Sequence, residues 1–314
     1  MDAIVVTTIS APTKAVREIA AYCKHSGQLF CCIGDRKSPN EFSVEGCRFI
    51  GIEQQSSLPF RLVGLLPEHH YARKNLGYLV AARAGATGIL ETDDDNIPMD
   101  GFWNERNTMI AGREFRARGW VNSYQYFTEN QVWPRGLPLQ YIRSQKVPEY
   151  QATRECPVQQ SLANGDPDVD AIYRLTIGSS VNFAEALPII LGNAQWSPFN
   201  SQNTWWDRTV FPLMYLPSFC SIRMTDIWRS LMTQRCLWAM GKSFSVHPAT
   251  VVQERNYHDL TADFELETPG YLHNHQIADQ LEELVDIEVT IKGRQNGCNQ
   301  TFNHNAFPRL LVDG

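Results

Sequence analysis

Three consecutive aspartates, Asp93, Asp94 and Asp95, follow the apolar run at residues 88–90 and precede Asn96. The apolar run predicts a buried strand, so the carboxylates gather where that strand ends. Open α/β sheets bind their ligands at the carboxyl ends of their strands. Adjacent carboxylates repel one another unless a cation offsets them, and hard divalent ions prefer such oxygen ligands. The triplet therefore predicts a Mg²⁺ or Mn²⁺ site that receives a diphosphate, while a solvated acidic turn is the plainer alternative.

Polar side chains also follow the first two expected strands. Their hydroxyl, carboxylate and cationic groups are of the types that bind a base, a ribose and a phosphate. The candidates for nucleotide binding here are Thr7, Thr8, Asp35, Arg36 and Lys37. By themselves, these are also ordinary turn residues.

A basic segment begins the expected helix that leads to the aspartate strand. It contains Arg73, Lys74 and Asn75, and His69 and His70 lie shortly before them. The free N–H groups of a helix N-terminus add to the charges of such side chains, and together they favour an anion. We expect Arg73, Lys74 and Asn75 to help bind the nucleotide, the alternative being a salt-bridged helix start.

Later in the chain, further acidic and imidazole groups are candidates for the same site. Asp168 and Asp170 lie in a second acidic loop, which lacks the twelve-residue pattern of an EF-hand. Asp226 begins an expected amphipathic helix, where it could simply cap the helix. A third metal ligand would have to come from far along the chain, and His247 and His258 are the candidates, although each could also be structural.

Composition limits the class of protein. The 314 residues are 43% hydrophobic and 20% charged, which is ordinary for a globular chain, and the net charge of -6 provides no basic surface for nucleic acid. No apolar stretch approaches the roughly 20 residues of a membrane helix, and the start lacks the pattern of a signal peptide. We therefore expect a cytoplasmic protein. The 8 cysteines form no C-x-x-C pair and are expected to be reduced core thiols.

Strand and helix patterns alternate along the first hundred residues. This alternation predicts an α/β fold, with a doubly wound, mostly parallel sheet, helices on both faces and a single large domain. The crowded aromatics between residues 103 and 133 are expected to be mainly core. Expected strands lie at 3–8, 29–33, 49–52 and 87–90, and expected helices at 13–20, 73–84, 226–238 and 270–290.

Several longer blocks of sequence resemble the STELLO family of glycosyltransferases. They occur in order between residues 3 and 265, at 4–17, 32–39, 71–78, 91–96, 132–138, 166–174, 198–204 and 226–229. The family is similar to GT-A-fold nucleotide-sugar enzymes and, more distantly, to plant UDP-arabinopyranose mutases that also glycosylate themselves. The resemblance implies a GT-A-like domain over 1–265, with a nucleotide-binding half at 1–100, an acceptor half at 101–265, and a C-terminal helix and tail at 266–314.

The same resemblance implies that Asp93 to Asp95 form a DXD-type motif. Asp93 and Asp95 would bind the metal, and Asp93 and Asp94 would face the nucleotide. In an inverting enzyme Asp226 would be the general base, whereas in a retaining enzyme Asp168 or Asp170 would lie near the anomeric carbon.

We therefore expect a transferase dependent on Mn²⁺ or Mg²⁺. It would move a sugar from a UDP- or GDP-linked donor to a hydroxyl of a glycan, a lipid-linked acceptor or a protein. The alternatives are an NDP-sugar mutase or self-glycosylating protein, and a catalytically silent scaffold that binds sugar nucleotides. The plant members have a membrane anchor, which we do not expect here.

Overall fold

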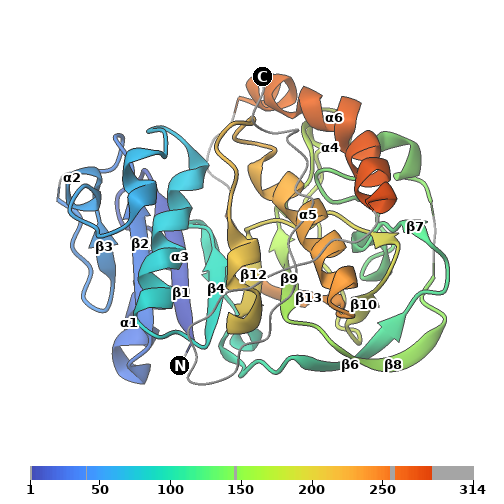
Figure 1. Ribbon diagram of the computed structural model, residues 1–314, viewed down its shortest axis with the longest axis horizontal. Helices are drawn as coiled ribbons and strands as arrows, with labels where there is room; N and C mark the ends of the chain where they lie inside the picture. The colour runs from blue at the N-terminus through green and yellow to red at the C-terminus, as the bar shows by residue number, and fades with distance from the viewer. Residues whose placement is uncertain (1, 40, 145–146, 255–258, 285–314) are drawn as a thin grey trace.

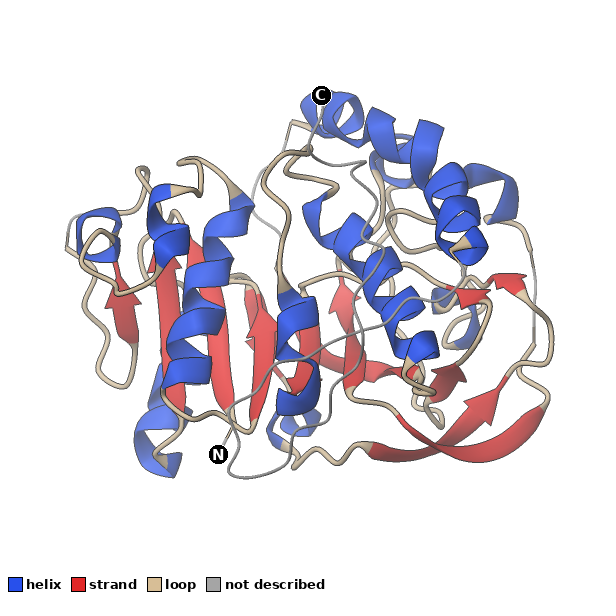
Figure 2. Cartoon of the chain, in the orientation of Figure 1, coloured by secondary structure: helices blue, strands red, loops and turns tan. Residues whose placement is uncertain are grey.

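The computed structural model describes residues 2–39, 41–144, 147–254 and 259–284. In this part of the chain, one 11-stranded mixed sheet runs through the molecule in the order β3-β2-β1-β4-β12-β9-β13-β10-β6-β8, and β5 pairs with β13. Helices cover the sheet, with α3 and α5 in front of it in the view of Figures 1 and 2. The predicted α/β class with a single large domain is confirmed.

The four strands at one end of the sheet are parallel, as the alternating pattern predicts. They are β3 (Arg48–Ile50), β2 (Leu29–Gly34), β1 (Ala3–Thr8) and β4 (Gly88–Thr92), in that spatial order. Parallel neighbours need crossover connections, which α1 and α3 provide. Because all four strands run the same way, their carboxyl ends lie at the same edge of the sheet.

Alternate residues of β1 pack on opposite helices, which is why the sheet is doubly wound. Ile4 packs with Val16 and Ile19 of α1 (Lys14–Ser26) on one face, and Val5 packs with Leu76 of α3 (Lys74–Arg83) on the other. The strand residues are almost entirely buried, as expected for a sheet covered on both sides. Thr13 caps α1 by accepting a hydrogen bond from the Val16 N–H at 3.2 Å.

Gly77 lets α3 lie directly on β1. A Cβ at this position would be 2.5 Å from Val5 Cγ1 and 3.1 Å from Ile33 Cγ1. We expect Gly77→Ala to lower the free energy of unfolding by about 1–2 kcal/mol, because overpacking outweighs the gain in helix propensity. Urea unfolding measures this, with Gly64→Ala as the control, since a Cβ there has no atom within 4 Å. A Gly77→Ala protein more stable than wild type would contradict the prediction.

The rest of the sheet is mixed in direction. β12 (Asn203–Asp207) is antiparallel to both β4 and β9 (Val158–Gly165), whereas β9 and β13 (Phe244–Gln253) are parallel. As a result, β8, β9 and β13 run with the first four strands, and β5, β6, β10 and β12 run against them. The other strands are β5 (Asn96–Pro98), β6 (Met109–Glu114), β8 (Tyr150–Glu155) and β10 (Ile189–Leu191), with a separate pair, β7 (Gly119–Trp120) and β11 (Gln195–Trp196).

The later helices pack in front of this mixed part. The predicted helix at 226–238 is α5 (Thr225–Ala239). The predicted helix at 270–290 is α6 (Leu260–Glu283), which begins ten residues earlier and continues through Pro269, while residues 285–290 lie outside the described residues. The predicted boundary at residue 265 therefore falls inside α6. The short helices are α2 (Ile52–Gln55), α4 (Ala171–Thr176) and 3-10 turns at Arg61–Gly64, Tyr71–Arg73, Asp100–Trp103, Tyr124–Tyr126, Leu139–Tyr141 and Arg208–Met214.

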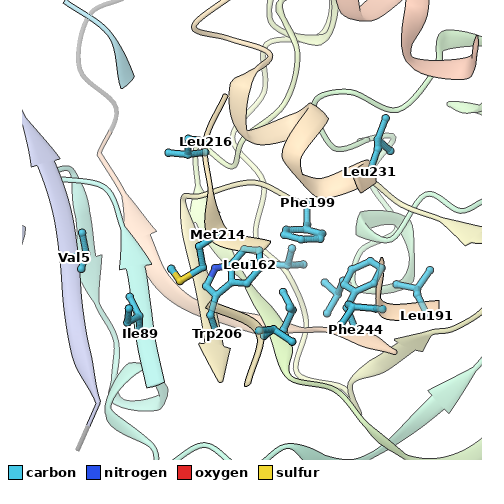
Figure 3. Packing of buried hydrophobic residues seen from close by; sticks show 14 of the residues in the cluster. Val5, Ile89, Leu162, Leu191, Phe199, Trp206, Met214, Leu216, Leu231 and Phe244 are labelled. Carbon is cyan, nitrogen blue, oxygen red and sulfur yellow. The ribbon is translucent and has the colours of Figure 1, made fainter. Parts of the chain in front are cut away.

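A continuous hydrophobic core joins the two parts of the sheet. Figure 3 shows Val5, Ile89, Trp206 and Phe244 along this core. Of the aromatic side chains predicted to be mainly core, Trp120, Tyr124, Phe127 and Trp133 are buried there, whereas Trp103 and Tyr126 are only partly buried. The described cysteines are free thiols, and of these Cys23, Cys31, Cys32 and Cys156 are buried as predicted, whereas Cys47, Cys220 and Cys236 are only partly buried.

Candidate functional site

A cavity of about 660 Å³ opens at the carboxyl ends of β1, β2 and β4. Its volume lies within the usual range for small-molecule sites, roughly 300–1,000 Å³. The structure brings most of the predicted site residues to its wall. Those that line it are Thr7, Thr8, Asp35, Lys37, Arg73, Asp93, Asp94, Asp95, Asp168 and Asp226.

The Asp93 carboxylate is held in place by Tyr71 and by a buried lysine, Lys74. The Tyr71 hydroxyl donates to Asp93 Oδ1 at 2.8 Å, and Lys74 Nζ lies 3.4 Å from the same oxygen. Lys74 is fully buried and also donates to the carbonyl oxygens of Thr92 at 2.8 Å and Ser201 at 3.1 Å. Lys74 therefore supports the aspartate triplet. The sequence had suggested that Lys74 would line the cavity, but it does not.

The other two aspartates are tied to different elements. The hydroxyl of Thr8 donates to the Asp94 carboxylate, and that of Thr13 donates to the Asp94 carbonyl. Gln253, the last residue of β13, donates through Nε2 to both carboxylate oxygens of Asp95 at 3.2 Å each. The triplet is thus connected to β1, to the start of α1 and to β13.

The donor atoms of this wall suit a hard divalent cation. Burial raises the pKa of Asp93 and of Asp94 even with the Lys74 ammonium nearby, so a further positive charge would favour their ionised forms. Among the described residues, no group of three or more His, Cys, Asp or Glu side chains is arranged to hold a metal by itself. A cation beside Asp93 and Asp95 would need further oxygens from a ligand, which is how Mg²⁺ commonly binds with substrate phosphates.

Asp35 lies at the end of β2, across the cavity. Its carboxylate accepts hydrogen bonds from the main-chain N–H of Arg36 at 2.7 Å and of His70 at 3.1 Å. The Arg36 side chain is instead exposed and forms a bidentate ion pair with Glu68, at 2.6 and 2.9 Å. Of the predicted cations after β2, only Lys37 lines the cavity.

Residues at the start of α3 make hydrogen bonds within the protein, and one of them, Arg73, also lines the cavity. Arg73 lines the cavity while its guanidinium donates to Gln55 Oε1 at 2.7 Å and to the Leu66 carbonyl at 3.1 Å. Asn75 bonds both main-chain groups of Leu216, at 2.8 and 2.9 Å. It therefore anchors the loop before α5 and is not part of the cavity wall.

Arg135 joins the two acidic residues that face the triplet. Its guanidinium donates to Asp168 at 2.7 and 2.8 Å and to Asp226 at 2.9 and 3.1 Å, and all three side chains are buried. Asp226 also accepts from the N–H groups of Ser201 at 3.2 Å and Ile227 at 3.0 Å. Burial opposes ionisation of Asp226, but Arg135 more than compensates and holds its pKa below the ordinary value.

Two further predicted candidates, Asp170 and His247, do not line the cavity either. Asp170 caps α4 by accepting from the Tyr173 N–H at 2.8 Å, and it accepts from Trp133 Nε1 at 2.7 Å. His247 lies within β13, with its Nε2 2.9 Å from the Ser245 hydroxyl. His258 lies outside the described residues.

The environment of His247 predicts a pH dependence of stability. Burial, and then the charge of Arg106, lower the pKa of His247 to about 4 from 6.5. Between pH 6.5 and 4, His247 is therefore protonated in the unfolded chain but neutral in the folded chain. The free energy of unfolding falls by about 3 kcal/mol as the pH drops through this range. We expect His247→Gln to remove this slope in urea unfolding at several pH values. His273→Gln is the control, because His273 is exposed, and it should leave the pH dependence of the free energy of unfolding unchanged. If His247→Gln also left this pH dependence unchanged, the assignment would be contradicted.

The residues of the wall that were not predicted from the sequence include Tyr71, Arg135, Gln202 and Gln253. Three of them lie in blocks that show the family resemblance, at 71–78, 132–138 and 198–204, which was the available signal. Nothing in the local sequence distinguishes Gln253 from any other strand glutamine.

The mixed sheet and the acidic cavity at its strand ends define a GT-A-like α/β fold. The chain is 30% identical over 270 residues to "Probable glycosyltransferase STELLO2" of Arabidopsis thaliana, a match that covers 79% of this chain. It is also 30% identical over 269 residues to "Probable glycosyltransferase STELLO1" of the same plant. These matches confirm the predicted relationship to the STELLO family.

The relationship is partial in length. The chain spans about a third of the curated relatives it matches, with 35% and 34% of their lengths covered. No protein-family profile matches the chain. Within the described residues, none of the helices has both the length and the apolar character needed to cross a bilayer.

Proposed function

We propose that this chain is a metal-dependent glycosyltransferase that uses a UDP- or GDP-linked sugar and a hydroxyl acceptor. The observation that supports this most directly is the meeting of Asp93 to Asp95 with Asp168 and Asp226 in one cavity at the strand ends. The names of both relatives support the same class of reaction.

In this proposal the two ends of the cavity bind different parts of the donor. Asp35 accepts hydrogen bonds from the base or ribose, and Lys37 and Arg73 face the phosphates. Asp95 and Asp93 hold Mn²⁺ or Mg²⁺, which offsets the charge of the departing nucleoside diphosphate when bound. The sugar lies between the triplet and the pair of carboxylates on Arg135.

The pair on Arg135 is proposed to stabilise the positive charge that develops on the sugar ring during transfer. Arg135 holds both carboxylates in place through its hydrogen bonds, so little reorganisation is needed as the charge forms. The acceptor hydroxyl must also lose a proton. Asp168 is better suited to accept it than Asp226, because its side chain is 10% exposed against 5% and because Asp226 has more main-chain donors.

Thermal unfolding with a panel of nucleoside diphosphates, each with and without Mn²⁺, tests the proposal. A ligand that binds only the folded state raises the unfolding temperature by mass action. We expect a rise for UDP or GDP that requires Mn²⁺. Incubation with the matching NDP-sugar should then release the diphosphate as the sugar is transferred to water in place of the acceptor hydroxyl, and recovery of an isomerised NDP-sugar instead would indicate a mutase. No response to any nucleotide with Mn²⁺ would overturn the proposal.

A further inference from the structure

Two glutamine side chains form a hydrogen-bonded chain along the wall of the cavity. Gln253 Nε2 lies 3.2 Å from each carboxylate oxygen of Asp95, and Gln253 Oε1 accepts from Gln202 Nε2 at 2.5 Å. Gln202 Oε1 in turn accepts from the main-chain N–H of Asp168 at 3.3 Å. This hydrogen-bonded chain of two glutamines thus extends from the loop that contains Asp168 to Asp95, the third aspartate of the triplet.

The chemistry at its two ends fixes the direction of both amides. An ionised carboxylate can only accept hydrogen bonds, and a main-chain N–H can only donate. Gln253 must therefore present its NH₂ group to Asp95, which leaves its carbonyl for Gln202. Gln202 must then present its NH₂ group to Gln253 and its carbonyl to Asp168. Reversing either amide would oppose two acceptors or two donors.

Both glutamines are also held by the main chain. The N–H of Gln202 donates to Asn200 Oδ1 at 3.0 Å, and its carbonyl accepts from Asn96 Nδ2 at 2.6 Å. Gln253 is paired with Asn96 in the antiparallel ladder of β13 and β5. Because the backbones are fixed and Gln202 is only 4% exposed, the amide chain has little freedom to rearrange.

We propose that Gln253, oriented by Gln202, is a positioning residue that sets the plane of the Asp95 carboxylate for a divalent cation. This inference rests on the proposed metal-dependent function. Hydrogen bonds to metal-binding carboxylates orient them, and losing such a partner typically weakens metal binding by about 10- to 100-fold. Through the two glutamines, the orientation of the Asp95 carboxylate also depends on the position of the Asp168 loop on the other side of the cavity.

The test is Mn²⁺ titration of the full chain in the presence of UDP or GDP, whichever raises the unfolding temperature, with the nucleotide alone as the blank. Electron paramagnetic resonance reads the free and the bound ion. We expect Gln253→Met to weaken Mn²⁺ affinity by about tenfold or more, while the unfolding temperature stays close to that of wild type. Gln202→Met should weaken it less, and the double variant should match Gln253→Met, because the two residues act in series. Gln202→Met also tests the chain if Gln253→Met fails to fold.

Gln159→Met is the matched control. Gln159 is a buried strand glutamine whose amide donates to the Asn107 and Cys156 carbonyls, and it does not line the cavity. Its loss should leave Mn²⁺ affinity unchanged. If Gln159→Met weakened binding as much as Gln253→Met, the effect would be general and the positioning role would be refuted.

Asp95→Asn separates failure of this inference from failure of the proposed function. If Asp95→Asn loses Mn²⁺ and Gln253→Met binds it as wild type does, the positioning role is wrong and the metal site stands. If wild type with the nucleotide binds no more Mn²⁺ than the nucleotide alone does, or no more than Asp95→Asn does, both are wrong.

Discussion

Replacing Asp95 with asparagine should lower kcat/KM for sugar transfer by at least about 100-fold, equivalent to about 3 kcal/mol of transition-state stabilisation. The substitution keeps the size of the side chain and removes the charge that the proposed cation needs. Without the cation, the departing diphosphate is left beside Asp93 and Asp94, whose carboxylates repel it. Donor consumption measured with the NDP-sugar identified by thermal unfolding gives the rate.

Asp100→Asn is the matched control, because Asp100 is an exposed aspartate just beyond the same turn and does not line the cavity. Its rate should equal that of wild type. If Asp95→Asn also kept the wild-type rate and the wild-type response to Mn²⁺, the metal assignment would fail.

Replacing Arg135 with methionine should lower the free energy of unfolding by about 3–5 kcal/mol. The guanidinium is the shared partner of Asp168 and Asp226, at 2.7 and 2.9 Å, and both carboxylates are buried. Without it, two like charges face each other in a site where burial already penalises ionisation. Urea unfolding at neutral pH measures the loss, and Asp168→Asn with Asp226→Asn in the same chain should recover part of it.

Arg116→Met provides the comparison for Arg135→Met. Arg116 pairs with Glu149 at 3.4 Å, and the two side chains are 73% and 46% exposed. Exposed pairs contribute about 0–1 kcal/mol, so this variant should lose little stability. A loss for Arg135→Met as small as that for Arg116→Met would mean that the two aspartates do not depend on the guanidinium.

The local parts of the fold could be predicted from the sequence. Strand and helix periodicity gave β1, β2, α3 and β4 nearly to the residue, since each has one or two buried faces. It also gave the start of α1, but this helix continues to Ser26, beyond the predicted end at residue 20. The position of the aspartate triplet followed, because the chain must turn where β4 ends. Pro269 obscured the start of α6, since proline removes a helix hydrogen bond and normally marks a boundary.

The partners of side chains could not be predicted in the same way. Lys74 and Arg73 are neighbours in sequence, yet one is enclosed beneath Asp93 and the other faces the cavity. Arg36 pairs with Glu68, 32 residues away, rather than with a phosphate site. The Arg135 guanidinium donates to the Asp226 carboxylate, which lies 91 residues further along the sequence. Such contacts depend on how β12, β13 and α5 pack, which no local pattern specifies.

The most direct test of the central claim is a crystal structure grown with Mn²⁺ and the nucleoside diphosphate that stabilises the chain, with manganese located by its anomalous scattering. The account predicts a manganese peak in the cavity, in contact with Asp95 and with the diphosphate, and the base near Asp35. Nucleotide bound in the cavity without manganese beside the triplet, or both bound elsewhere on the protein, would contradict it.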